Sequence, residues 1–231
     1  MTGIIVLVFM FWPDLQPERD KTPTVAISDF NVDKERNIQA DEYYTDMDSE
    51  VKTRPVKWTS SMATITLRNE GDDTVTIKKA TLHLLAFENL GCKDGGGLGY
   101  PEGRYGFKIG DADKPGKTLV QPMRWKLPAH DAETMAFSVG PSAPDPEVIQ
   151  VYRYQLTLEP DRGSPITLPV VVHAAPEGYL AKTGEGERDY AAALTDPCWR
   201  GAERFAKGVQ ESDRASPEYR YLQSRLDALR R

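Results

Sequence analysis

The two cysteines are the residues with the clearest potential chemistry in this 231-residue chain. Cys92 begins a glycine-rich stretch, and Cys198 lies near the start of a predicted C-terminal helix. If the body of the chain is extracytoplasmic, the two thiols can oxidise to a disulfide that ties the tail to the rest of the fold. Two separate thiols are the alternative, because sequence spacing does not determine proximity in space.

Two loops match ion-binding or phosphate-binding motifs only in part. Asp46, Asp48 and Glu50 alternate as calcium ligands do, but the central glycine and the distal bidentate glutamate are missing. The segment GDADKPGKT, residues 110–118, resembles a P-loop, yet its glycine spacing is one residue too long and strand-forming residues follow it. Both are predicted to be surface loops, so we expect no metal site and no cofactor.

The three histidines, His83, His130 and His173, are separated in the sequence and lack the spacing of metal ligands. His130 precedes Asp131 in a predicted turn, but no nucleophile motif accompanies this pair. We therefore predict no catalytic residue and a protein that is not an enzyme. The alternative is a small-ligand sensor or enzyme whose site the fold assembles from dispersed residues, among them His130 and Asp131.

The composition is that of a globular protein with an acidic balance. Hydrophobic residues make up 39% of the chain and charged residues 28%, and the mean hydropathy is -0.52. The net charge of -6 argues against nucleic acid as a partner, because binding a phosphate backbone needs a concentrated positive field. Seventeen prolines and eighteen glycines between strand-like runs favour an all-β body.

An apolar run opens the chain at residues 3–12, GIIVLVFMFW. A helix of that length rises about 15 Å and cannot cross a hydrocarbon core of roughly 30 Å. No basic residues precede the run and no cleavage site follows it, so a cleaved signal peptide is not predicted. We interpret residues 1–23 as a truncated membrane anchor with its linker, because aromatic residues crowd the end of the run. A buried first strand and a helix lying on the membrane surface are the alternatives.

Residues 24–175 alternate between apolar and polar with a period of two, clearest at 62–68, 134–139 and 166–172. This period predicts half-buried antiparallel strands. Further strands are predicted at 24–32, 105–109, 118–125 and 148–158. About eight strands with mostly short connections predict a mainly β fold, a two-sheet antiparallel sandwich. Two connections, 33–57 and 91–104, are long enough for a functional or disordered loop.

The segment ATITLRNEGDDTVTIKKATLHL predicts two further details. The polar stretch at residues 69–73 includes Gly71, so residues 62–87 are predicted to form a β-hairpin. In its second arm the inward set starts with Val75 and Ile77 and resumes at Ala80, one residue out of phase. This slip predicts a bulge near Lys78 and Lys79.

This segment, together with LPAHDAETMAFSVG further along, resembles bacterial extracytoplasmic immunoglobulin-like sandwiches, including cell-adhesion-related modules. The order of segments is similar to that of uncharacterised, membrane-anchored bacterial proteins in which such a sandwich follows an N-terminal helix. The resemblance covers residues 24–175 and implies an immunoglobulin-like sandwich. It provides no catalytic residues to transfer. The tail, residues 176–231, departs from those modules.

The tail changes to a helical period. Pro197 and the Ser216-Pro217-Glu218 segment are typical starts of a helix. A pair of amphipathic α-helices follows, with apolar stripes that are expected to pack on each other and on the sandwich. The alternative is a partner-facing or dimerising stripe on the last helix, formed by Tyr219, Leu222, Leu226 and Leu229.

These patterns together predict a membrane-anchored, non-enzymatic binding or structural module with an extracytoplasmic body. Its long connections, 34–57 and 91–104, would face a protein or cell-envelope partner. The other interpretation is a cytoplasmic assembly protein that interacts through its C-terminal helices.

Overall fold

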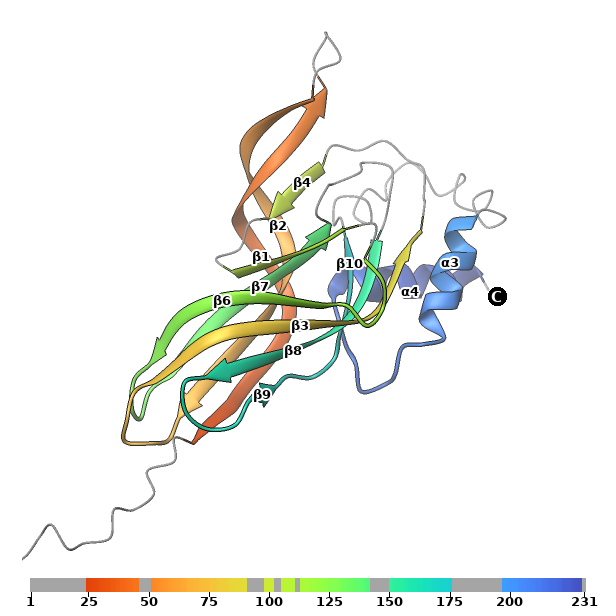
Figure 1. Cartoon of the computed structure of the whole chain (residues 1–231). Helices are drawn as coiled ribbons and strands as arrows, with labels where there is room; N and C mark the ends of the chain where they lie inside the picture. The colour runs from red at the N-terminus through yellow and green to blue at the C-terminus, as the bar shows by residue number, and fades with distance from the viewer. Residues whose placement is uncertain are drawn as a thin grey trace, which may run out of the picture.

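The computed structural model describes residues 24–45, 51–90, 98–101, 105–110, 113–141, 150–175 and 197–229. Over these ranges the chain is mainly β, with two sheets and two helices (Figure 1). The apolar opening run, the acidic residues at 46–50 and Cys92 lie outside them. No helix in the described part is long and apolar enough to cross a membrane.

The first sheet has five strands in the order β4-β1-β2-β7-β5. Its strands are β1 (Val25–Thr45), β2 (Val51–Asn69), β4 (Leu98–Pro101), β5 (Tyr105–Ile109) and β7 (Ala132–Pro141). All neighbours are antiparallel except β5 and β7. The strands predicted at 24–32, 105–109 and 134–139 are therefore confirmed.

The second sheet has the order β11-β10-β8-β3-β6, and β9 pairs with β8. Its strands are β3 (Val75–Asn89), β6 (Thr118–Leu127), β8 (Gln150–Pro160), β9 (Ile166–Thr167), β10 (Val171–Ala175) and β11 (Arg214–Ala215). β11 runs parallel to β10, and the other pairs are antiparallel. The run predicted at 166–172 is divided between β9 and β10.

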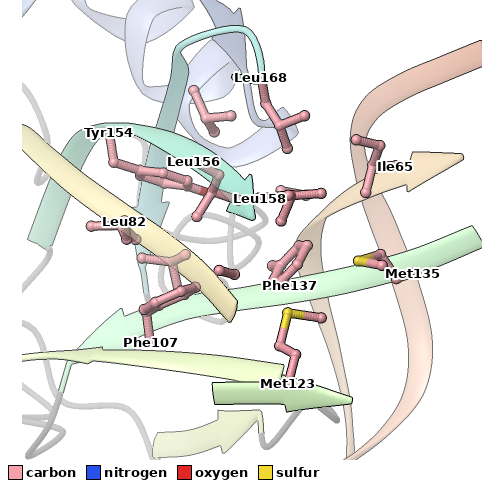
Figure 2. Close-up of a cluster of buried hydrophobic side chains, with 14 of the residues drawn as sticks. Ile65, Leu82, Phe107, Met123, Met135, Phe137, Tyr154, Leu156, Leu158 and Leu168 are labelled. Atoms are coloured by element: carbon pink, nitrogen blue, oxygen red, sulfur yellow. The ribbon is translucent and has the colours of Figure 1, made fainter. Parts of the chain in front are cut away.

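One hydrophobic core is shared by the two sheets. Alternate residues of β2 and β7, such as Ile65 and Phe137, lie in the same cluster as Leu82 of β3 and Leu156 of β8. Figure 2 shows side chains from both sheets meeting in this layer. Because each fully buried aliphatic side chain contributes about 1.5–3 kcal/mol, this layer is the main source of stability for the sandwich.

The predicted hairpin at residues 62–87 is wrong, because its two strands belong to different sheets. β2 pairs with β1 and β7, whereas β3 pairs with β6 and β8. The connection crosses the sandwich, and Asn69 holds it by donating to the carbonyls of Asp73 (2.8 Å), Leu127 (3.2 Å) and Pro128 (3.1 Å). Two alternating strands around a polar turn look the same in sequence whether they pair or face each other.

The predicted bulge in the following strand is confirmed. The register of β3 shifts between Ile77 and Lys79 against both β6 and β8. Val75, Ile77 and Ala80 are all fully buried. The bulge therefore lets the apolar side chains before it and after it point into the same core.

The connection predicted at 33–57 is not a loop in the described part of it. β1 and β2 continue as a paired hairpin up to Thr45 and Val51. A register shift between Glu35 and Ile38 separates this outer part from the sandwich. The outer strands extend beyond the shared core, at the top of Figure 1. Among the described residues, the strands of the second sheet do not pair with this outer part, which agrees with its lack of clear apolar alternation.

Both predicted C-terminal helices are present, as α3 (Pro197–Ala206) and α4 (Pro217–Leu229). The hydroxyl Oγ of Ser216 accepts a 3.2 Å bond from the backbone N of Tyr219, a normal N-terminal cap. Their apolar stripes form a second core with Val151 of β8 and Val172 of β10. β8 and β10 are therefore covered on both faces, which explains the nearly continuous apolar sequence around Val172.

Candidate functional site

The candidate site lies where β11 and α4 meet the first sheet. The backbone N of Arg214 donates to Val170 O (2.7 Å) and that of Ser216 donates to Val172 O (2.8 Å). These two bonds fix the segment beside β10 and determine where α4 begins. The first turn of α4 therefore lies against β1 and β2, and the carboxylate of Glu218 lies between the helix and these strands.

Glu218 is a carboxylate buried between the helix and the first sheet. Only 2% of the residue is exposed. Its Oε2 accepts a 2.5 Å hydrogen bond from Ser61 Oγ on β2, and its Oε1 lies 3.7 Å from Lys34 Nζ on β1. Oε1 itself has no hydrogen-bond donor among the described residues. A buried carboxylate costs free energy unless it is paired, so Ser61 and Lys34 hold this contact between α4 and the sheet.

His173 of β10 lies in the same buried region. Its ring stacks on Tyr152 with centroids 6.4 Å apart, and only 3% of the residue is exposed. Burial lowers the pKa of His173, and the charge of Glu218 opposes that shift only in part. The imidazole is therefore neutral at pH 7.

An ion pair fixes the loop that leads into β11. Arg153 Nε lies 2.7 Å from Asp213 Oδ2, and Arg153 Nη2 lies 3.3 Å from Asp213 Oδ1. Asp213 also accepts a 2.9 Å bond from the backbone N of Gln210. Burial of the Tyr219 side chain raises the pKa of its hydroxyl to about 12, and the negative charge of Asp213 adds to this shift. The carboxylate of Asp213 is thus neutralised by the chain itself.

A pocket of about 320 Å³ opens beside these residues, between the edge strand β1 and the β11–α4 junction. It is lined by Phe30, Asn31, Val32, Asp33, Asp213, Arg214, Ala215 and Arg220. Its walls come from segments almost two hundred residues apart in the sequence. A volume of this size is at the lower end of the range for small-ligand pockets.

The buried cluster does not have the geometry of an activated nucleophile. In a serine triad the hydroxyl bonds to a histidine, which in turn bonds to the carboxylate. Here Ser61 bonds directly to Glu218. This arrangement positions α4. Among the described residues, no three His, Cys, Asp or Glu side chains are grouped as metal ligands.

The residues predicted to face a partner from the last helix lie in the chain's own second core. Tyr219, Leu222 and Leu226 are 2–4% exposed and pack among α3, β8 and β10. Leu229 ends α4, and its side chain lies outside the described part. These three residues thus pack against the other helix and the sandwich, which is the first of the two arrangements considered for the apolar stripe of the last helix.

The predicted disulfide stays a prediction. Cys198 lies in the first turn of α3, and Cys92 is outside the described residues.

The other two histidines, His83 and His130, have different neighbours from each other and from His173. His130 occupies a turn with φ of 56°, and its Nε2 lies 3.1 Å from Asp72 Oδ1 at the surface. Asp131 accepts a bond from the backbone N of Ala132. His83 lies on β3, half-buried, with its Nδ1 3.4 Å from Thr118 Oγ1. The loop 110–118 leads into β6 and not into a helix, so its P-loop likeness ends there.

Sequence reasoning did not identify Ser61, Lys34 or Asp213 as parts of a site. Glu218 was recognised only as a helix-start residue. A carboxylate in the first turn of a helix is usually exposed, so nothing in the local pattern distinguishes this buried one. The pairing of β11 with β10, which carries Glu218 inward, involves two residues and leaves no periodic signal.

No protein-family model, no curated protein and no solved structure matches this chain.

Proposed function

We propose that this chain is a membrane-anchored binding module with an immunoglobulin-like sandwich, and that it is not an enzyme. Its strand order supports this class of fold: β1, β2 and β7 form one sheet and β3, β6, β8 and β10 the other. The chain crosses between the sheets after β2, β3, β5, β6 and β7, so consecutive strands are repeatedly placed in opposite sheets, as in a Greek key. The opening run would anchor the body on the extracytoplasmic side, and a protein or cell-envelope component would be the partner.

The observation that carries the proposal is that both long connections contribute to one structure. Residues 98–101 form β4, which pairs with β1 from Ala40 to Tyr43. We call the resulting three-stranded unit the arm: residues 38–45 of β1, residues 51–58 of β2, and β4. Two segments that were expected to act as separate loops thus form one surface, which extends beyond the shared core (Figure 1).

The sequence of the arm suits recognition of a protein. It contains Tyr43, Tyr44 and Trp58, and tyrosine and tryptophan are enriched in interfaces. Among the described residues, residues 51–58 of β2 pair with β1 alone, so this strand forms a second edge of the arm. Pro55 lies on that edge, is exposed and lacks an N–H, which limits uncontrolled strand addition. We therefore expect recognition mainly through side chains.

The test removes the outer part of the arm, including most of the segment of β1 that pairs with β4, and leaves the strands of the sandwich in place. In the variant, residues 41–55 are replaced by Asn-Gly, a turn that joins paired strands between Ala40 and Val56. The full chain and the variant are produced in membranes, washed with carbonate and used to capture envelope components. We expect both proteins to remain in the membrane and only the full chain to retain a saturable partner.

The matched control is His130→Gly, which changes an exposed turn where a positive φ favours glycine. Its capture should equal that of the unmodified chain. Equal capture by the arm-less variant would contradict the proposed binding surface. Release of the full chain by carbonate would contradict the anchor and favour the cytoplasmic interpretation.

A further inference from the structure

We infer that the pocket between β1 and the β11–α4 junction is a second binding site, for a small monocarboxylate carried on an apolar body. This site shares no residue with the arm and does not depend on the function proposed for it. The ligand would be a free carboxylic acid or the C-terminal residue of a peptide, since both present the same chemistry.

The charges of the pocket favour an anion. Asp213 is already paired with Arg153, so its negative charge is compensated within the chain. Arg214 and Arg220 are both among the lining residues, and Asp33 is the remaining acidic residue there. Arg220 is oriented by a 2.7 Å bond from its Nη1 to the carbonyl of Ala215, and among the described residues this is its one side-chain hydrogen bond. Planar guanidinium groups match the geometry of a carboxylate.

The rest of the lining selects among anions. Phe30, Val32 and Ala215 provide an apolar part of the wall that suits a hydrocarbon or aromatic body. Asp33 would repel a dianion such as phosphate more strongly than a monoanion. Together these features favour a carboxylate with an apolar body over inorganic phosphate.

The walls are held in place without a ligand. The backbone of Arg214 is bonded to Val170, and the adjacent first turn of α4 is fixed through Glu218 and Ser61. The pocket residues of β1, from Phe30 to Asp33, are paired with β2 from Ile65 to Met62. The site therefore needs little rearrangement to bind, which lowers the entropic cost of binding.

The experiment titrates the full chain with phenylpropionate, phenylpropionamide and inorganic phosphate, and follows binding by NMR and calorimetry. We expect saturable binding of phenylpropionate with a dissociation constant on the order of 1 mM. The neutral amide and phosphate should bind about tenfold more weakly, because each loses part of the match to the arginines. An acetylated dipeptide ending in phenylalanine distinguishes the two sources: tighter binding than phenylpropionate indicates a peptide C-terminus, and equal or weaker binding a free acid.

Arg214→Gln is the test variant, and Arg124→Gln is its control. Arg124 is exposed on β6, at the opposite edge of the same sheet. We expect about tenfold weaker binding for Arg214→Gln, as for loss of one charge-assisted contact, and no change for the control. The inference is overturned if phenylpropionate does not saturate, if the amide binds equally well, or if both variants behave alike.

Discussion

At the scale of single residues, the contact between Ser61 and Glu218 joins the tail to the sandwich. Ser61→Ala leaves a buried carboxylate oxygen without its donor, which costs about 1–3 kcal/mol. We expect the free energy of unfolding in urea to fall by that amount. Ser28→Ala is the matched control, because Ser28 is an exposed serine of the same sheet that donates to Thr66 O. Its effect should stay within about 0.5 kcal/mol, and equal losses would contradict the account.

His173 makes stability depend on pH in a defined direction. Burial, opposed by Glu218, lowers its pKa below the ordinary value of 6.5. As the pH falls below about 6.5, the unfolded chain binds a proton that the folded chain excludes, so the free energy of unfolding decreases. This loss continues until the pH reaches the lowered pKa of the folded state.

The measurement is urea unfolding at several pH values between 7.5 and 5. We expect His173→Gln to flatten the fall in stability relative to the unmodified chain. His130→Gln, at an exposed histidine, should leave the fall unchanged. A fall of the same slope in His173→Gln would show that other groups cause it.

At the scale of elements, the bulge in β3 keeps two halves of one strand facing the same core. Deleting Lys78 would remove the extra residue and turn either Val75 and Ile77 or the set from Ala80 onward away from the core. Exposing Val75 and Ile77 alone costs about 3–6 kcal/mol. Lys78→Ala keeps the bulge at an exposed position and should change stability by less than about 0.5 kcal/mol. Chemical denaturation of both variants checks this, and a stable deletion variant would contradict it.

The same elements show which parts of the fold can be predicted from the sequence. The bulge and both helix starts depend on local patterns, so the position of Lys78 and the cap at Ser216 could be predicted correctly. The pairing of β2 depends on distant partners, and an alternating strand does not specify its neighbour. The burial of Glu218 depends on β11 joining β10, a long-range event with no periodic signal.

At the scale of the whole molecule, one chain builds two cores that share strands. β8 and β10 send alternate residues to the sandwich and to the helices, as Tyr152 and Val151 illustrate. Residues 197–229 are therefore part of the folded body, and Tyr219, Leu222 and Leu226 of α4 are covered by the chain itself. The two proposed binding surfaces, the arm and the pocket, both include residues of β1.

The most direct test of the proposed function places a photo-crosslinking amino acid in the arm of the full, membrane-bound chain. It replaces Tyr44, and the control replaces Val120, an exposed residue of β6. We predict that illumination gives one discrete crosslinked species from position 44 and none from position 120. Crosslinking from position 120 alone, or none from position 44 while a partner is still captured, would contradict the arm as the binding surface.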